Sequence, residues 1–195
     1  MARPPAVTAP SSLTQTELRD LAVTHALPNG TSILIRAIRP DDKARLLAAF
    51  GNLERKSIYT RFFGHKKELP EAELEQVTNV DFDQIVALVA TISSGEAETI
   101  IAEARYVRDV GNDLRPGAEV AFIVADDFQG QGIASCLLGH LVRIARGKGL
   151  SHFDADVLDT NRPMLAVFAR SGLPLRQQID RGVVRVVLSL DAGQS

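Results

Sequence analysis

Runs in which hydrophobic residues alternate with polar ones, or follow one another without a break, predict the strands of this chain. The first run is TSILIRAI at 31–38, directly after the turn signal LPNG. QIVALVATI (84–92) is apolar and β-branched, and TIIAEARYV (99–107) returns after the turn GEAE as an antiparallel partner. AEVAFIVA (118–125) follows a loop at 110–117. These last three runs predict a meander of three antiparallel strands.

Apolar residues spaced three and four positions apart predict the helices. Three helices are expected before the meander, at 39–50, 54–63 and 70–79. The longest follows the meander, and its apolar residues fall on one helical face: Ile133, Leu137, Leu141 and Ile144.

The last part of the chain predicts a strand, a helix and a further strand, at 151–158, 161–172 and 182–190. Antiparallel strands followed by this arrangement predict a mixed α/β (α+β) sheet in one domain, which we place at 27–195. Residues 1–26 are rich in Pro, Ala, Ser and Thr and predict a flexible N-terminal arm.

Composition and charge narrow the functional classes. The 195 residues are 45% hydrophobic and 24% charged, which is typical of a globular protein. A formal net charge of -2 offers no basic excess for nucleic acid, and no apolar run is long enough to span a membrane. The N-terminus lacks the continuous apolar core of a signal peptide, so we expect a cytoplasmic protein. The single cysteine, Cys136, excludes a disulfide framework, and the four histidines share no metal-ligand spacing, so no metal is expected.

The turn DDFQGQGIAS (126–135) carries the strongest chemical signal, because its glycines stand between an apolar strand and an amphipathic helix. A triphosphate P-loop needs Gly-Lys-Ser/Thr, and nothing of that form follows Gly132. A dinucleotide fingerprint needs three glycines and a doubly wound sheet, and only Gly130 and Gly132 are present. A third interpretation is a loop whose free backbone N–H groups, at a helix N-terminus, bind a coenzyme pyrophosphate. On the glycines alone, a tight turn without a ligand stays open.

Residues around this turn resemble the acetyl-CoA-binding loop of the GNAT N-acetyltransferase family, whose pattern is Gln/Arg-x-x-Gly-x-Gly/Ala. The chain supplies this pattern as Gln129, Gly132 and Ala134. Asn161 follows the next strand, as in the family, and VFARSGL comes after it with leucine where phenylalanine is usual. Together with IRAIRPDD, SIYTRFF and VDFDQIVALVA, the turn is similar to the acetyltransferase domains of bacterial protein-lysine acetyltransferases, over about residues 28–190.

This resemblance implies a single GNAT-type domain with a mostly antiparallel twisted sheet of about six to seven strands, flanked by helices. It implies acetyl-CoA as co-substrate and the ε-amino group of a protein lysine as acceptor, with acyl-CoA synthetases as the substrate class. The residues implied to contact acetyl-CoA lie at a strand end, in the glycine turn and around the last helix: Phe122, Ile123, Val124, Gln129, Gly130, Gln131, Gly132, Ile133, Ala134, Asn161 and Phe168.

Acetyl transfer to an amine needs a base, because a lysine ammonium, with a pKa near 10.4 in water, is not nucleophilic. Glu119 corresponds by resemblance to the general base of the lysine-acetylating branch, and Glu103 is the weaker alternative. Many members protonate the departing thiolate with a tyrosine where this chain has Phe168, so the thiolate is expected to leave unaided. Phe168 then either packs on the CoA arm or belongs to the core. Two other functions stay open: a GNAT enzyme acting on a small amine, and a CoA-binding regulatory module without turnover.

Overall fold

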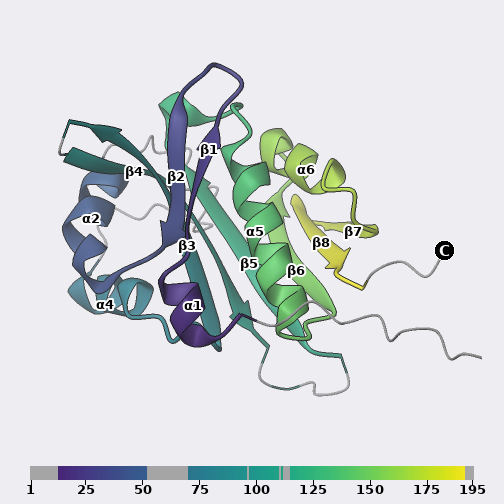
Figure 1. Cartoon of the computed structure of the whole chain (residues 1–195). Coiled ribbons are helices and arrows are strands. Elements are labelled where there is room, and N and C mark those ends of the chain that lie inside the picture. The colour runs from purple at the N-terminus through teal and green to yellow at the C-terminus, as the bar shows by residue number, and fades with distance from the viewer. Residues whose placement is uncertain (1–12, 52–69, 96, 110, 112–114, 192–195) are drawn as a thin grey trace, which may run out of the picture.

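The chain forms one mixed sheet, and the computed structural model describes residues 13–51, 70–95, 97–109, 111 and 115–191 of it (Figure 1). In chain order its strands are β1 (Ala22–Ala26), β2 (Ser32–Ala37), β3 (Ile85–Ser94), β4 (Ala97–Arg108), β5 (Gly117–Val124), β6 (His152–Leu158), β7 (Leu175–Asp180) and β8 (Val183–Ser189). They lie side by side in the order β1-β2-β3-β4-β5-β6-β8-β7, and all neighbours are antiparallel except β5 and β6. The mostly antiparallel α/β sheet predicted from the sequence is confirmed, with two more strands than the pattern indicates.

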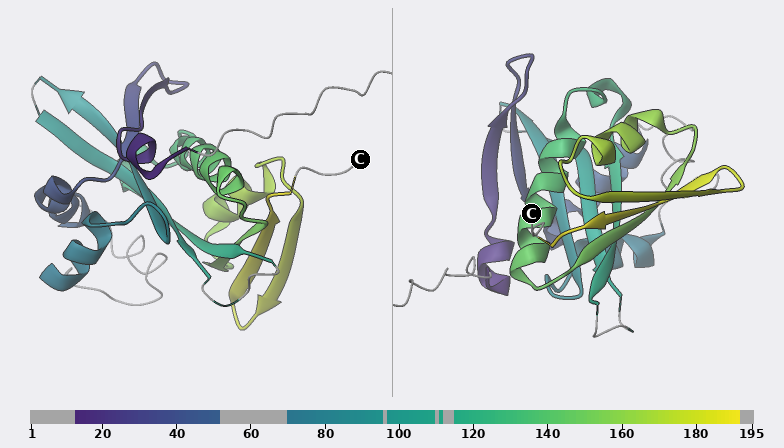
Figure 2. Two further views of the ribbon diagram at one scale, coloured as in Figure 1. Left: turned by 60° about the horizontal axis from the view of Figure 1, so that its bottom comes forward. Right: turned by 90° about the vertical axis from the view of Figure 1, so that its right-hand side faces the viewer.

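Helices cover both faces of this sheet. They are α1 (Gln15–Arg19), α2 (Lys43–Gly51), α4 (Glu71–Thr78), α5 (Ile133–Gly147) and α6 (Arg162–Ala169), with the 3-10 turns η1 (Pro40–Asp42) and η2 (Asp126–Phe128). Figure 2 shows α5 on one face, with α2 and α4 on the other. The predicted apolar stripe of α5 is buried against β3, β4 and β5, because its leucines and isoleucines recur on the side that faces the sheet. The predicted helix at 54–63 lies outside the described residues.

The second half of the predicted N-terminal arm is folded, which corrects the sequence analysis. A capping box between Thr14 and Glu17 starts α1, and β1 pairs antiparallel with β2. Leu18 and Leu21 are both buried. Two buried leucines in a polar stretch are enough to hold this segment on the sheet, but they give too weak a pattern to predict it.

Strand β7 escapes prediction for a similar reason. Five of its six residues are exposed, so LRQQID shows no alternation between apolar and polar positions. Within the described part of the chain it is an edge strand, and its one pairing partner there is β8.

The pairing between β5 and β6 shapes the site described below. Three residue pairs join these parallel strands, and the last of them is Glu119 with Asp154. Beyond it β5 runs on to Val124 against β4, and β6 runs on to Leu158 against β8. Within the described residues, β5 and β6 therefore form a cleft whose apex lies at Glu119.

The strand register also fixes which residues share a face. Glu119 and Ile123 lie on the face of the sheet that carries Arg36, whose side chain binds Asp42, the last residue of η1 before α2. Phe122 and the other even-numbered residues of β5 lie on the α5 face. A single strand thus presents a carboxylate to one side of the sheet and an apolar edge to the other.

Candidate coenzyme site

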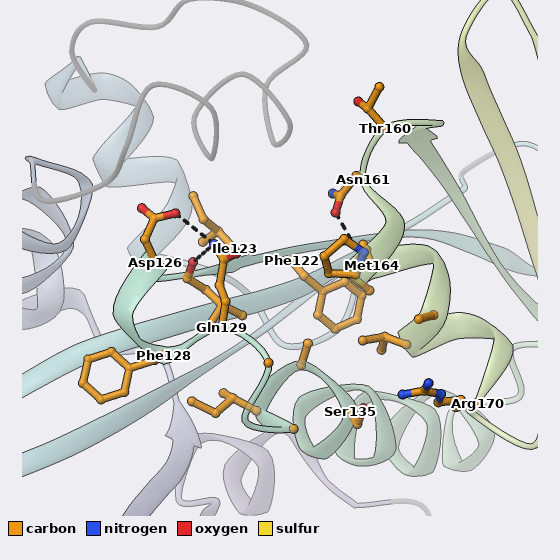
Figure 3. A pocket seen from close by; sticks show the side chains of 18 residues that line it. Phe122, Ile123, Asp126, Phe128, Gln129, Ser135, Thr160, Asn161, Met164 and Arg170 are labelled. Atoms are coloured by element: carbon orange, nitrogen blue, oxygen red, sulfur yellow. Dashed lines mark hydrogen bonds between the residues drawn. The ribbon is translucent and has the colours of Figure 1, made fainter.

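A cavity of about 430 Å3 opens in the cleft between β5 and β6, at the N-terminus of α5 (Figure 3). One side is formed by the end of β5, the glycine turn and the start of α5, and the other by α6 with the loop before it. Its lining residues are Phe122, Ile123, Val124, Asp126, Phe128, Gln129, Gly130, Gly132, Ile133, Ala134, Ser135, Thr160, Asn161, Pro163, Met164, Ala166, Val167 and Arg170.

The glycine turn leads into α5 through two residues of positive φ. Gly130 has a φ of 73° and Gly132 a φ of 87°, a region that L side chains rarely adopt. A Cβ at either position would meet no atom within 4 Å, so the backbone conformation rather than crowding requires glycine. The two glycines singled out in the sequence thus occupy positions whose backbone conformation favours glycine, and their contact with a ligand stays a prediction.

The N-terminus of α5 leaves backbone donors free for an anion. Its N-cap is Gly132, which has no side chain to cap the helix. The amide of Cys136 donates to the carbonyl of Gly132 at 3.0 Å, so the three amides before it precede the intrahelical ladder. With the helix dipole, these amides suit a phosphate or pyrophosphate at the mouth of the cavity.

The outer edge of β5 offers further backbone groups. Phe122, Ile123 and Val124 pair with β4 on one side, and on the other side β6 has diverged. The Gln129 side chain donates to the carbonyl of Val124 at 3.1 Å and to the Asp126 carboxylate at 3.0 Å, which ties the turn to the strand end (Figure 3). An extended amide-containing chain could therefore lie along this edge as an additional strand would.

Most of the predicted acetyl-CoA contacts meet around this cavity, but Gln131 and Phe168 do not line it. Gln131 accepts a hydrogen bond from Asn29 at 2.9 Å and donates to the carbonyl of Asp127 at 3.0 Å, so it is directed toward the turn between β1 and β2. Phe168 is buried, and its ring stands edge-on to Phe122 at 6.0 Å between centroids. Of its two predicted roles, the structure assigns Phe168 to the core behind Phe122.

Asn161 caps α6 and lines the cavity at the same time. Its side-chain oxygen accepts from the amide of Met164 at 3.3 Å (Figure 3). The cap fixes the start of α6 beside the cleft, so the wall that faces the glycine turn depends on this residue.

Glu119 lies at the apex of the cleft rather than in the cavity wall. Its side chain is exposed on the α2 face of the sheet. The alternative carboxylate, Glu103, is buried and accepts a hydrogen bond of 2.7 Å from Arg105, two residues along its own strand. Glu103 is therefore held in an ion pair, whereas Glu119 is accessible.

Sequence reasoning missed Arg170, the one lysine or arginine among the described residues that line the cavity. It follows the C-terminus of α6, where a cation is expected for the helix dipole alone, so its position in the sequence carries no separate signal. A guanidinium at this wall suits a phosphate group of the ligand.

Other chemistries find less support in the structure. Burial raises the pKa of the Cys136 thiol, which disfavours a reactive thiolate at neutral pH. The described residues contain no group of three or more His, Cys, Asp and Glu side chains that could hold a metal ion. No helix in the same part of the chain has the length and apolar character needed to cross a membrane.

Comparison with known proteins agrees with this geometry. The model of the acetyltransferase (GNAT) family matches residues 56–173. Acetyltransferase Pat of Mycolicibacterium smegmatis is 36% identical over 155 residues, which cover 80% of this chain but 45% of that protein, so the chain spans about half the length of this relative. Acetyltransferase PA5475 of Pseudomonas aeruginosa is 30% identical over 139 residues, 71% of this chain and 73% of that protein.

A solved structure shows the same architecture. The GNAT domain of S. lividans PAT superposes with a TM-score of 0.77 at 33% identity, covering 86% of this chain and 96% of that domain.

Proposed function

Because the chain belongs to the GNAT acetyltransferase family, we propose that it transfers the acetyl group of acetyl-CoA to a protein lysine, with Glu119 as general base. One observation supports this most directly. The pairing of β5 with β6 stops at Glu119, so an accessible carboxylate stands next to the unpaired edge of the strand that lines the cavity.

The cavity fits acetyl-CoA group by group. The free amides at the start of α5, with Gly130 and Gly132, hold the pyrophosphate, and Arg170 binds a phosphate from the opposite wall. The free edge of Phe122 to Val124 binds the amide-bearing pantetheine arm. Acetyl-CoA, when bound, supplies an activated thioester whose thiolate is a good leaving group.

Glu119 supplies the proton acceptor. Only the neutral amine attacks the thioester carbonyl, so the ammonium of the acceptor first loses a proton to the carboxylate. The backbone of β5 holds the coenzyme arm while the acceptor approaches Glu119 from the α2 face. The buried Phe168 has no proton to donate, so no side chain of α6 at this position assists departure of the thiolate.

A protein acceptor is favoured by the openness of the face that carries Glu119. On this face β6, β8 and β7 present exposed side chains, among them Asp156, Arg185 and Gln178. A lysine on the surface of a folded protein, such as an acyl-CoA synthetase, reaches Glu119 across this surface. A small amine, in contrast, is normally enclosed by its binding site.

A thiol-release assay tests the proposal. Acetyl-CoA is incubated with acyl-CoA synthetases and, separately, with a panel of small amines, and acceptors are weighed by mass spectrometry. CoA release with a mass gain on a lysine supports the proposal. Transfer to small amines alone supports a metabolite acetyltransferase, and tight binding of acetyl-CoA without release to any acceptor supports a regulatory module.

The variant Glu119→Gln tests the base. We expect acetyl-CoA binding to be retained and kcat to fall by about 10²–10⁴-fold, the usual contribution of a general base. Glu71→Gln is the matched control, because Glu71 is an exposed glutamate of α4 whose carboxylate pairs with Lys43, away from the cavity lining. Near-normal turnover of Glu119→Gln would exclude the role.

Arg170→Gln tests the orientation of the coenzyme. Loss of one charge-assisted hydrogen bond to a phosphate should weaken acetyl-CoA binding about tenfold, or ~1.4 kcal/mol. Acetyl-pantetheine lacks the phosphates and should bind both proteins equally. An equal loss for both ligands in calorimetry would place Arg170 elsewhere than at a phosphate.

A further inference from the structure

Asp154 is the direct neighbour of Glu119 at the apex of the cleft. The two residues form the last register pair between β5 and β6. Residues in register on neighbouring strands point to the same face of the sheet, with backbones about 4.8 Å apart. Two carboxylates therefore stand side by side on the face where the acceptor approaches, an arrangement that like charges alone would disfavour.

His152 lies on the same face, two residues before Asp154, and contacts its carboxylate. Its Nε2 is 3.1 Å from Oδ2 of Asp154, and its Nδ1 is 2.9 Å from Oγ of Ser151. The Ser151 hydroxyl donates its one proton to the carbonyl of Pro116 at 3.0 Å, so it accepts from Nδ1–H. Carboxylate and hydroxyl oxygen both accept here, and the two contacts are satisfied together when the ring carries two protons.

Gly117 leaves room for the ring in this position. The imidazole lies directly over Gly117, the register partner of His152 on β5, and a Cβ there would collide with the ring. The lack of a side chain on the residue before Ala118 and Glu119 thus allows His152 to reach Asp154.

We propose that His152 and Asp154 are positioning residues that set the pH at which Glu119 acts as a base. This inference rests on the proposed function of Glu119. Because both ring nitrogens of His152 face hydrogen-bond acceptors, the ring carries two protons in this arrangement, and His152 and Asp154 form an ion pair with no net charge beside Glu119. Without the imidazolium, Asp154 stands as an uncompensated negative charge next to the base.

Among the described residues, the other charged groups near Glu119 on this face keep their own partners in these variants. Arg105 of β4 is bound to Glu103, and Asp156 of β6 lies across from Arg185 of β8. None of them is in register with Glu119, whose partners are Val107 and Asp154. Substitutions of His152 or Asp154 therefore change the charge directly next to Glu119, and the other pairs keep their charges.

The experiment measures the acid limb of kcat/KM for the full chain and for two variants. His152→Gln leaves the Asp154 charge alone and should move the acid limb up, while Asp154→Asn leaves the imidazolium alone and should move it down. At this separation each shift should be about 0.5 pH unit. The double variant should return the acid limb close to that of the parent chain.

Asp156→Asn is the matched control, since it makes the same chemical change on the same strand and face two residues further along. The pH of the acid limb should stay in place, whether or not the height of the kcat/KM profile changes through acceptor binding. A merely structural role of His152 lowers kcat/KM at every pH without displacing the limb. Single variants that shift the limb in the same direction, or not at all, would overturn the proposal.

A second readout does not need turnover. Carbon NMR of the labelled Glu119 carboxyl, assigned with Glu119→Gln, follows its titration directly in the same variants. If no acceptor is acetylated, the proposed function fails while this titration still reports on the pair. Opposite displacements in His152→Gln and Asp154→Asn support the inference, and a Glu119 titration that neither variant moves would refute it.

Discussion

The buried ion cluster around Arg36 should dominate the stability of the acceptor side of the sheet. Arg36 is 1% exposed and Asp42 is not exposed at all, and the guanidinium binds both Asp42 oxygens at 2.7 Å. Glu98 accepts from the same guanidinium at 2.9 and 3.0 Å. These contacts join β2, the turn η1 directly before α2, and the hairpin of β3 and β4, so the cluster fixes the start of α2 on the face that carries Glu119.

The substitution Asp42→Asn removes one negative charge with almost no change in shape. Breaking a buried pair from one side typically costs 3–5 kcal/mol, because the remaining charge is left in a poorly solvated place. Glu98 still compensates Arg36, so we expect the lower end, about 3 kcal/mol of unfolding free energy at neutral pH. Asp41→Asn is the control: Asp41 is 72% exposed and meets Arg45 at 3.7 Å, so it should change stability by less than about 0.5 kcal/mol.

The same cluster makes stability fall in acid. Burial would raise the pKa of Asp42, but hydrogen bonds from Arg36 and the Arg39 amide outweigh it and hold the pKa below the ordinary value of 3.8. The hydrogen bond from Arg36 likewise lowers the pKa of Glu98, against a smaller effect of burial. A group whose pKa is lower in the folded than in the unfolded chain stabilises the fold at pH values above its unfolded pKa. This contribution is lost as the pH falls through and below about 4.

Urea unfolding at neutral pH and at several pH values below about 4, followed by circular dichroism, measures both effects. Asp42→Asn should lower the midpoint at neutral pH, and the difference from the parent chain should shrink as the pH falls below about 4, where the Asp42 carboxylate of the parent chain becomes protonated. An Asp42→Asn midpoint within error of Asp41→Asn would refute the argument that this pair is buried and intact. A difference that grows toward acid would contradict the direction of the pKa shift.

Three further outcomes are expected. Gly132→Ala should lower acetyl-CoA affinity about tenfold in calorimetry, because a positive φ disfavours any side chain. Gly172 has a φ of 75° but lies outside the cavity lining, so Gly172→Ala should cost only about 1–2 kcal/mol of stability. Equal losses of affinity in the two variants would contradict this. The buried Tyr106 hydroxyl has no partner among the described residues, so Tyr106→Phe should stabilise the fold by about 1 kcal/mol in urea, and a loss would show a hidden partner. Burial, His25 at 2.8 Å and the Arg143 charge lower the pKa of His140. The melting temperature should therefore decrease as the pH falls below about 6.5, and His140→Leu should make this decrease smaller. An unchanged dependence of melting temperature on pH would exclude this histidine as its source.

Local signals in the sequence were enough for the elements that carry their own pattern. The stripe of α5, the glycine turn and the meander each show a period or a turn residue that sterics require, and the structure has them where the pattern predicts. The fold of residues 13–26 and the role of Phe168 were not predictable in this way. Both depend on contacts between residues far apart in the sequence: Leu18 is buried against the sheet, and Phe168 packs on the ring of Phe122.

The position of the base relative to the coenzyme site is set by how far β5 and β6 stay paired, which no sequence motif encodes. Successive residues of β5 face opposite sides, so Glu119 and Phe122 serve opposite faces, about 10 Å apart along the strand. The place where β6 leaves β5 decides which of them stands at the apex. One more register pair would cover the backbone next to Glu119, and one fewer would expose Ala118 instead. The position of the acceptor relative to the thioester therefore depends on how far two parallel strands stay paired, which is why the turn predicts a ligand but not the geometry of the reaction.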